Sequence, residues 1–568
     1  MLRRNEMNTG TPRIANRRLV LWAALLVLLG ATVGHVLAKP GDPKGTSRQD
    51  FLDGIKVLGA VYERVFYNYV EDIDSDELLE AGINGMLDYL DEHSQYLPPT
   101  NYDNLMMSTE GEFGGLGITI NVRDHYPTVV SPIEGTPAFL MGIQGGDKII
   151  EIEGETTFDF TNDDAVKLLR GEPGTAVTIT IEREGSPKPF PLTIVRAIIK
   201  VESVPYAFMI DDIGYLRIQS FARSTTDEVR EAVKNLEAQG ARGIVMDLRW
   251  NPGGLLDAAC GVSELFLEGG DLIVYTKGRL RNQNRSYFAE DHGKSSLTSL
   301  PMIVMINGAS ASASEIVSAA VQDHDRGLVV GKTSFGKGSV QTVFPLAEHK
   351  ALKLTTAKYY TPSGRSIHKD RQRDDGIDMT EATSEDAADE VELPREKRER
   401  YQTDAGRTVF GGGGISPDIE IEQPFLSDFQ VAIERDYALF QFSTKWHAHH
   451  EVTEETHADD VMVAEFHGFL KSRENLPGYL EVYELTLNDA ILAAEDDYIR
   501  QGLRRELMRL AFGQETAYRV GIEDDIQLQE TLALFKRAST TAELLAIAAE
   551  WEAQRVVEAE TENLATVH

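Results

Sequence analysis

Residues 243–254 read Gly-Ile-Val-Met-Asp-Leu-Arg-Trp-Asn-Pro-Gly-Gly. The largely apolar first half of this stretch is typical of a strand buried on both faces of a parallel sheet. The Asn-Pro-Gly-Gly end predicts a tight turn, because proline and glycine favour turn conformations. A helical pattern, Leu255–Leu267, follows at once. The stretch therefore predicts a strand, a turn and a helix in succession, the unit of an α/β fold.

The same alternation surrounds this unit. Further strands are predicted at Ile213–Gln219, Leu272–Thr276, Met302–Ile306 and Leu328–Gly331. An amphipathic helix is predicted at Thr225–Gln239. Strands that alternate with helices indicate a layered α/β core with a mostly parallel sheet.

A serine-rich run connects one of these strands to the next helix. Residues 309–315 read Ala-Ser-Ala-Ser-Ala-Ser-Glu, between the strand Met302–Ile306 and a helical stretch, Ile316–Gln322. A strand-to-helix turn projects a side chain from the sheet edge and offers free N–H groups to an oxyanion. Serine at a helix start is also a common N-cap. Taken alone, the run favours the cap.

Three other parts of the chain have their own patterns. Between Phe51 and Leu90 the apolar residues recur at three and four, which predicts a helical hairpin. Glu112–Ile120 is a glycine-rich loop that enters a strand; such a loop can hold a carboxylate, although alone it is better explained as a hairpin turn. Short strands then continue to Val195, predicting a β-rich domain of about one hundred residues. From Ser427 onward the pattern is helical again.

Composition limits the kinds of partner, the disulfide chemistry and the extent of the folded core. Lys and Arg number 56 against 91 Asp and Glu, a formal charge of −35 that argues against nucleic acid as a partner. The single cysteine, Cys260, excludes an intramolecular disulfide, and its apolar helical setting favours a buried structural thiol. Residues 369–410 are charged and poor in large apolar side chains, so a flexible insertion is expected there.

The N-terminus carries an export signal. Five arginines precede Leu19–Ala38, an apolar run with no charged residue apart from a titratable His35. This pattern predicts a signal peptide or a signal anchor, with the remainder of the chain outside the cytoplasm, in the periplasm or cell envelope. Val36-Leu37-Ala38 resembles a cleavage site, while the length of the run suits a membrane anchor equally well.

The glycine-rich segment resembles a PDZ domain of the type found in bacterial proteases. The motifs that carry the resemblance are Phe113-Gly-Gly-Leu-Gly-Ile118, Ser131-Pro132, Thr136-Pro137-Ala138 and Gly142-Ile-Gln-Gly-Gly-Asp-Lys-Ile-Ile150. The resemblance implies that the loop binds the C-terminal carboxylate of a protein substrate through Gly115, Leu116, Gly117 and Ile118. It also implies that Arg170 links a bound tail to the active site, the alternative being an ordinary surface arginine.

Four segments of the core resemble, in the same order, the C-terminal processing (tail-specific) peptidases, which are PDZ-containing serine proteases with a Ser-Lys dyad. They are Asp247-Leu-Arg-Trp-Asn-Pro-Gly-Gly-Leu255, Ser310-Ala-Ser-Ala-Ser-Glu-Ile316, Gly331-Lys-Thr-Ser-Phe-Gly-Lys-Gly-Ser-Val-Gln341 and Tyr359-Tyr-Thr-Pro-Ser-Gly-Arg-Ser-Ile367. The resemblance covers about residues 50–422. It implies Ser312 as the nucleophile, Lys337 as the general base and Gln341 as the residue that orients the lysine. The oxyanion hole is expected from the N–H of Ala313 with that of Gly253 or Gly254.

The chemistry of a Ser-Lys pair favours this assignment. A serine hydroxyl needs a base to take its proton, and lysine is a base only when neutral. Lys337 lies between glycines with no acid adjacent in the sequence, whereas Lys332 is better explained as a surface charge. Gln341 can accept from the amine without stabilising a positive charge. Glu315 and Asp323 are candidates for holding neighbouring backbone or a water, the alternative being a merely structural role.

A Ser-His-Asp triad and a metal site are the weaker chemical alternatives. His292, His324, His349 and His368 have no recognisable orienting acid, and no Gly-x-Ser-x-Gly elbow is present. The cluster His447, His449, His450 lacks the spacing of a zinc motif. No metal and no cofactor are therefore predicted.

The sequence thus predicts an α/β multidomain protein: a ClpP/crotonase-like core with an inserted PDZ domain, an N-terminal helical arm and a C-terminal helical extension. The expected domains are a signal peptide or anchor (1–40), a helical region (41–104), the PDZ domain (105–198), the protease core (199–426) and the helical extension (427–568). The expected activity is cleavage of proteins with exposed apolar C-termini. The expected partners are such substrates, an adaptor protein, the membrane through the N-terminal segment and further copies of the chain through helical regions. The alternative is a proteolytically silent PDZ scaffold or chaperone.

Overall fold

The computed structural model describes residues 48–290, 296–347, 349–369 and 398–566. The apolar run at 19–38 and most of the charged insertion lie outside these residues. The chain forms two compact units, residues 1–96 and 97–568. Within the described residues, no helix combines the length and apolarity needed to cross a membrane.

The first unit contains the predicted helical hairpin, α2 (Arg48–Asn68) and α3 (Ser75–Asp88). Asp74 caps α3 by accepting from the N–H groups of Asp76 and Glu77. No residue of α2 is buried, and most of its large apolar side chains are exposed. The helices confirm the predicted helical arm. A short strand, β1 (Gln95–Leu97), ends this part of the chain.

The second unit begins with α4 (Pro99–Glu110) and the PDZ-like domain. Its sheet has the order β3 (Ile118–Arg123), β4 (Tyr126–Pro132), β5 (Lys148–Ile152), β7 (Ala176–Glu182) and β8 (Phe190–Val195), with β6 (Glu155–Thr156) beside β5. β2 (Glu112–Gly115) pairs with β9 (Ala197–Lys200), and α5 (Pro137–Leu140) and α6 (Asn162–Leu169) complete the domain. Alternate residues of β7, among them Val177, Ile179 and Ile181, are fully buried, as a sheet with one covered face requires.

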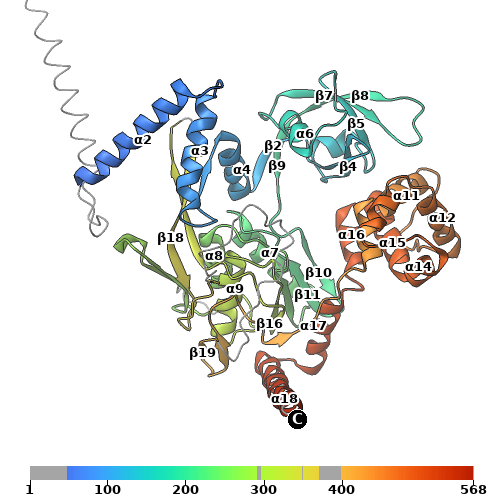
Figure 1. Cartoon of the computed structure of the whole chain (residues 1–568). Coiled ribbons are helices and arrows are strands. Elements are labelled where there is room, and N and C mark those ends of the chain that lie inside the picture. Colours follow the sequence, from blue (N-terminus) through green and yellow to red (C-terminus); the bar gives the residue numbers. More distant parts are fainter. Residues whose placement is uncertain (1–47, 291–295, 348, 370–397, 567–568) are drawn as a thin grey trace, which may run out of the picture. The chain divides into compact units, whose positions relative to one another are not determined.

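The α/β core is built on a six-stranded sheet. Its order is β10 (Tyr206–Ile210), β11 (Ile213–Arg217), β12 (Ile244–Asp247), β15 (Met302–Ile306), β16 (Leu328–Gly331) and β21 (Ile419–Glu420), parallel from β11 onward. One face is covered by α7 (Thr225–Ala238), α8 (Leu256–Phe266) and α9 (Ala313–Asp323). The core confirms the α/β fold predicted from the strand and helix alternation (Figure 1).

A second, antiparallel sheet lies beside the first. It includes β13 (Leu272–Gly278), β14 (Arg285–Phe288), β17 (Ser339–Pro345) and β18 (Ala351–Tyr360), with the short helix η1 (Arg281–Gln283) between β13 and β14. β19 (Arg400–Gln402) and β20 (Thr408–Phe410) form a separate hairpin. Lys337 lies two residues before β17, so this sheet carries the lysine predicted to be the base, while the parallel sheet carries the serine loop.

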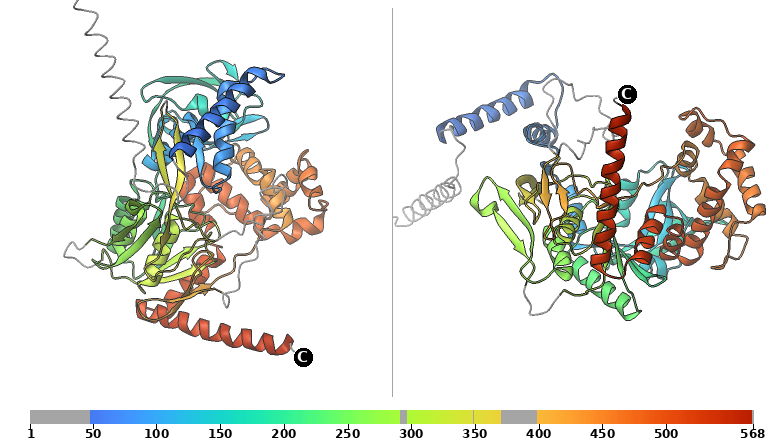
Figure 2. Two further views of the ribbon diagram at one scale, coloured as in Figure 1. Left: turned by 60° about the vertical axis from the view of Figure 1, so that its left-hand side comes forward. Right: turned by 90° about the horizontal axis from the view of Figure 1, so that it is seen from below.

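The helices after Ser427 form two groups (Figures 1 and 2). The first is a bundle with its own apolar core, comprising α10 (Asp428–Arg435), α11 (Ala438–His447), α12 (Asp460–Lys471), α13 (Leu476–Glu481), α14 (Asp489–Ala494), α15 (Asp496–Phe512) and α16 (Gln514–Gly521). The second group, α17 (Ile526–Arg537) and α18 (Thr541–Thr566), packs apolar side chains against the other face of the parallel sheet. The sheet is therefore a middle layer, and the C-terminal extension supplies one of the layers that cover it.

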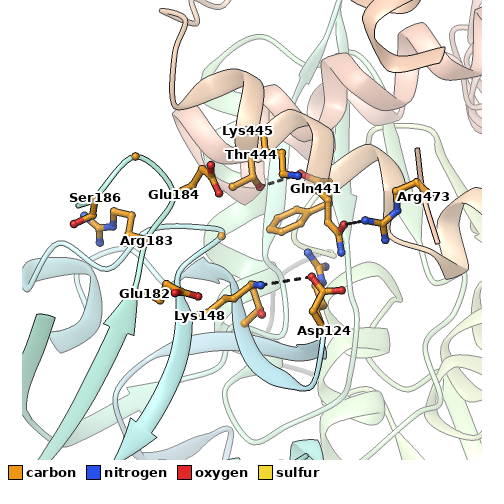
Figure 3. A pocket seen from close by; sticks show the side chains of 15 residues that line it. Asp124, Lys148, Glu182, Arg183, Glu184, Ser186, Gln441, Thr444, Lys445 and Arg473 are labelled. Atoms are coloured by element: carbon orange, nitrogen blue, oxygen red, sulfur yellow. Dashed lines mark hydrogen bonds and ion pairs between the residues drawn. The ribbon is translucent and has the colours of Figure 1, made fainter. Parts of the chain in front are cut away.

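The helical bundle also contacts the PDZ-like sheet. The Arg123 guanidinium lies 3.7 Å from the Phe440 ring centroid and 4.4 Å from that of Tyr437, and the Asn121 amide donates to the Tyr437 hydroxyl over 2.7 Å. Beside these contacts is a cavity of about 440 Å³ lined from both sides, where Lys148 pairs with Asp124 (Figure 3). Burial lowers the pKa of Arg123 to about 10, and the rings contribute cation–π attraction.

Candidate active site

The three serines of the 309–315 run have different environments. The Ser310 hydroxyl accepts from the Asn307 N–H over 2.9 Å and donates to the Leu248 carbonyl over 2.8 Å. The Ser314 hydroxyl donates to the Asn251 carbonyl over 3.0 Å. Ser310 and Ser314 are completely buried, whereas Ser312 is partly exposed. Two of the serines thus tie the loop to the turn after β12, and Ser312 is the one that a substrate can reach.

Ser312 has a strained backbone. It precedes α9 with φ 54° and ψ −109°, a conformation that costs a non-glycine residue about 1–3 kcal/mol. The bend directs the chain from the sheet edge into the helix, so the following residue, Ala313, begins α9. Its N–H is one of the helix-start donors that lack an intrahelical acceptor.

The Asn251-Pro-Gly-Gly254 turn lies directly against the serine loop. The Ala311 N–H donates to the Asn251 carbonyl over 3.0 Å. A Cβ on Gly253, which has φ +100°, would lie 2.8 Å from the Ser312 Cβ and 2.9 Å from the Ala313 nitrogen. Only glycine allows this approach.

The expected oxyanion donors differ in their availability. The Gly253 N–H donates to the Asn251 side-chain oxygen over 2.9 Å. The N–H groups of Ala313 and Gly254 have no acceptor within the part of the chain that the structure describes. Of the two glycines, Gly254 therefore has the N–H that is free for a substrate oxygen.

Glu315 connects the serine loop to the lysine loop. Its Oε2 accepts the N–H of Ser312 over 2.8 Å and that of Lys337 over 2.9 Å. Its Oε1 accepts the Ser334 hydroxyl over 2.5 Å and the Gly336 N–H over 2.7 Å. Burial raises the pKa of the Glu315 carboxyl to about 7, and the four donors oppose this rise. The expectation that Glu315 holds neighbouring backbone is confirmed.

Tyr359 makes a second connection that sequence reasoning missed. Its hydroxyl, at the end of β18, lies 3.2 Å from the Ser312 carbonyl oxygen and also bonds to the Lys337 carbonyl oxygen. Burial, followed by the charge of Glu315, raises the pKa of Tyr359, so the phenol stays neutral and able to donate. Tyr359 opens one of the four motifs, but only the fold shows which groups it faces.

The remaining predicted side chains have definite positions. The Gln341 amide donates to the hydroxyls of Ser339, over 2.9 Å, and Thr355, over 3.3 Å. Lys332 pairs with Glu422 and Glu420; burial would lower its pKa, but these two carboxylates raise it. Lys332 is therefore held in the charged form, which is unsuitable for a base.

His324 does not have the arrangement of a triad histidine. His324 does have an acid partner, because its Nδ1 lies 2.8 Å from Asp404, but its Nε2 bonds to the Leu272 carbonyl. Both ring nitrogens are engaged, so this histidine is structural. His292 lies outside the described residues. No group of three His, Cys, Asp or Glu side chains placed to hold a metal occurs among the described residues.

The glycine loop of the PDZ-like domain has free donors. The N–H groups of Leu116 and Gly117 have no acceptor in the described chain, while the Leu116 side chain is buried in the domain core. Gly117 has φ +80° and packs against Thr136. Ile118 opens β3, and Gly115 pairs with Ala197 of β9. Arg170, at the end of α6, donates to Asn104 over 3.0 Å and lies 4.8 Å from the Phe113 ring.

Comparison with known proteins gives the class. A family model for peptidase family S41 matches residues 212–380, and a PDZ-domain model matches residues 128–183. The chain is 45% identical over 360 residues to a carboxy-terminal-processing protease of Bartonella bacilliformis, an alignment that covers 62% of this chain and 79% of that protein. It is 33% identical to the carboxy-terminal processing protease CtpA of Bacillus subtilis, covering 61% and 72%. The solved photosystem II D1 C-terminal processing protease is 27% identical, with coverage of 56% and 89% and a TM-score of 0.32.

The chain belongs to the carboxy-terminal-processing proteases of peptidase family S41, which are PDZ-containing serine peptidases. This confirms the family predicted from the four core motifs and the glycine loop. Neither family model includes the helical extension from residue 427 onward.

Proposed function

We propose that the chain is an endopeptidase in which Ser312 is the nucleophile and Lys337 the general base. The observation that carries this assignment is a pair of contacts shared by the two residues: one Glu315 oxygen accepts both N–H groups, and the single Tyr359 hydroxyl lies within hydrogen-bond reach of both carbonyl oxygens. The main chains of nucleophile and base are thereby held together, as proton transfer requires.

The proposed reaction follows the usual course of acyl transfer. Neutral Lys337 takes the Ser312 proton as the hydroxyl oxygen attacks the scissile carbonyl. The N–H groups of Ala313 and Gly254 stabilise the resulting oxyanion, which is the step at which fixed donors contribute most. Lys337 then protonates the leaving amine, and water releases the acyl group by the same path in reverse. Gln341, fixed by Ser339 and Thr355, is proposed to orient the lysine.

Recognition of the substrate is assigned to the glycine loop. The free N–H groups of Leu116 and Gly117 suit a terminal carboxylate, and a bound tail would extend β3 as an added strand. Arg170 contacts α4, which links the PDZ domain to the preceding chain, and is proposed to transmit binding. Arg170→Ala should then reduce the stimulation of cleavage by an apolar tail while the affinity for that tail changes little.

The decisive experiment compares lysine and serine variants on a protein with an apolar, unstructured tail. Ser312→Ala and Lys337→Ala should each abolish cleavage and still bind the tail. Lys332→Ala is the matched control, because it removes a charged lysine from the same segment and should remain active. Proteolysis by both Ser312→Ala and Lys337→Ala would exclude the dyad. The proteolytically silent scaffold is the alternative, and cleavage by the unaltered chain would exclude it.

The cellular location is proposed from the N-terminal sequence, and self-association is proposed from the exposed face of α2. Residues 19–38 would export the chain or anchor it outside the cytoplasm, with an adaptor protein as a further partner. The exposed apolar side chains of α2, including Phe51, Ile55, Leu58 and Val61, suit a second copy of the chain. Light scattering should give a smaller assembly for Leu58→Lys than for the unaltered chain; equal masses would exclude this face.

A further inference from the structure

The strand that leads to the oxyanion turn has one face directed toward the C-terminal extension. Successive residues of a strand alternate between faces, and the even-numbered Ile244, Met246 and Leu248 belong to the apolar cluster shared with α7, α8 and α9. Val245 belongs to the opposite cluster, which contains Leu528, Phe535 and Leu544 of the extension. The polar residues Asp247 and Arg249 continue this odd-numbered series.

Arg249 is a buried cation whose guanidinium is held from two sides. It is 3% exposed. Its Nη2 lies 2.8 Å from Asp247 and 2.6 Å from Asp525, and its Nη1 donates to Asp525 and Gln527 over 3.0 Å each. Burial would lower the pKa of Arg249, but the two carboxylates outweigh it and raise the pKa, so the guanidinium stays charged.

The extension supplies three of these four contacts from one short segment. Asp525 is also the N-cap of α17, where it accepts the Leu528 N–H over 3.0 Å, so its position is fixed by the helix. The Gln527 amide donates to the Ile421 carbonyl over 2.8 Å. The Tyr518 hydroxyl, on α16, lies 2.6 Å from the Tyr215 hydroxyl. The Tyr215 hydroxyl in turn donates to Asp247. Residues 518–527 belong to neither matched family segment.

Arg249 lies immediately before the turn that faces the nucleophile. Trp250 has φ +62° and donates its N–H to the Asn307 side chain over 3.0 Å. Asn251 then accepts from the Ala311 N–H and the Ser314 hydroxyl of the serine loop. A shift of Arg249 would therefore strain the hydrogen bonds that hold the turn with Gly253 and Gly254 against the loop of Ser312. Removing one carboxylate from a buried ion pair favours such a shift, because the remaining charge is left partly uncompensated.

We propose that residues 518–527 of the C-terminal extension position the oxyanion turn of the protease core, with Asp525 acting through Arg249 as the positioning residue. The inference rests on the proposed role of the turn in oxyanion binding. It gives the extension a function in catalysis in addition to covering the sheet. Substrate binding through the PDZ domain should not depend on this contact between Asp525 and Arg249.

The test uses the full chain with Asp525→Asn and the matched control Asp524→Asn. Asp524 is the exposed neighbour, so the control makes the same change in charge without touching Arg249. We expect Asp525→Asn to lower kcat about 10- to 100-fold with KM nearly unchanged, the pattern of a lost transition-state interaction. The inhibition constant of a peptide aldehyde, whose adduct oxygen occupies the oxyanion hole, should rise by a similar factor. Asp525→Glu should restore part of kcat.

Unchanged kcat in Asp525→Asn, or an equal loss in Asp524→Asn, would overturn the proposal. A fall in kcat matched by an equal fall in the folded fraction, with an unaltered inhibition constant, would overturn it in favour of a merely structural role. If Asp525→Asn does not fold, Tyr518→Phe provides the milder variant, and a kcat equal to that of the unaltered chain would be contrary to the proposal. Active Ser312→Ala would instead refute the dyad itself, so the two failures can be distinguished.

Discussion

Ser312 and Lys337 donate their backbone N–H groups to the same atom, Oε2 of Glu315, over 2.8 and 2.9 Å. The main chains of the two residues are thus held at a fixed spacing by one carboxylate oxygen. Because the shared acceptor is completely buried, solvent cannot replace it when it is removed.

Glu315→Gln should strongly reduce activity. The amide keeps one acceptor oxygen but turns an NH2 group toward donors that now have no acceptor. Hydrogen bonds to charged groups contribute about 1.5–3 kcal/mol, which corresponds to a loss of about 10- to 100-fold in kcat/KM. Steady-state cleavage of a tail-bearing protein measures the effect. Glu237→Gln, on the exposed end of α7, is the control and should be neutral; a fully active Glu315→Gln would show that the bridge is dispensable.

The same carboxyl should make stability depend on pH. Its pKa rises from 4.5 to about 7 on folding, so its contribution to stability is complete below pH 4.5 and is lost as the pH rises through 7. At 1.36 kcal/mol per pH unit the loss is about 3 kcal/mol. Urea unfolding can measure it in a Ser312→Ala background, which prevents self-cleavage. Between pH 4.5 and 8 the protein with Glu315 should lose stability relative to the Gln variant. A difference independent of pH would contradict the shift.

Gly253→Ala should inactivate the enzyme. The new methyl group would lie 2.7 Å from the Ala311 carbonyl oxygen and 2.8 Å from the Ser312 Cβ, at a φ of +100° that alanine rarely adopts. Displacement of the turn should lower kcat/KM at least about 100-fold, the scale of a lost oxyanion donor. Gly308→Ala is the matched control in the adjoining loop, because a Cβ there meets nothing within 4 Å. Equal activities of the two variants would argue against close packing at the nucleophile.

Cys260 should be unreactive in the folded protein. Burial, with smaller contributions from Asp257 and Glu264, raises the pKa of its thiol to about 12, so very little thiolate exists at pH 8. Iodoacetamide should therefore label the native chain slowly and leave its activity intact, whereas the urea-unfolded chain should react readily. Rapid native labelling with loss of activity would place the thiol nearer the catalytic machinery than its burial indicates.

Local patterns were sufficient to predict much of the protein. The strand-turn-helix unit at 243–267 and the serine run follow from apolar periodicity and from turn residues that are adjacent in the chain. The preference for Ser312 over its neighbours and for Lys337 over Lys332 came from motifs of a few residues each. In the structure Ser310 and Ser314 are buried in backbone contacts, and Lys332 is ion-paired. The dyad and its partners remain predictions until the variants are measured.

Contacts between distant segments could be assigned only by the tertiary structure. Tyr359 follows Lys337 by 22 residues, and Asp525 follows Arg249 by 276. No periodicity relates such pairs, because their meeting depends on how sheets and helices pack. The sequence by itself determined the strand and helix pattern, the protease motifs and the family. The tertiary structure alone decided which carboxylate bridges the serine and lysine loops, which glycine N–H is free, and that the C-terminal helices cover the face of β12 that carries Asp247 and Arg249. The physical reason is that burial and pairing of polar groups are properties of the assembled layers.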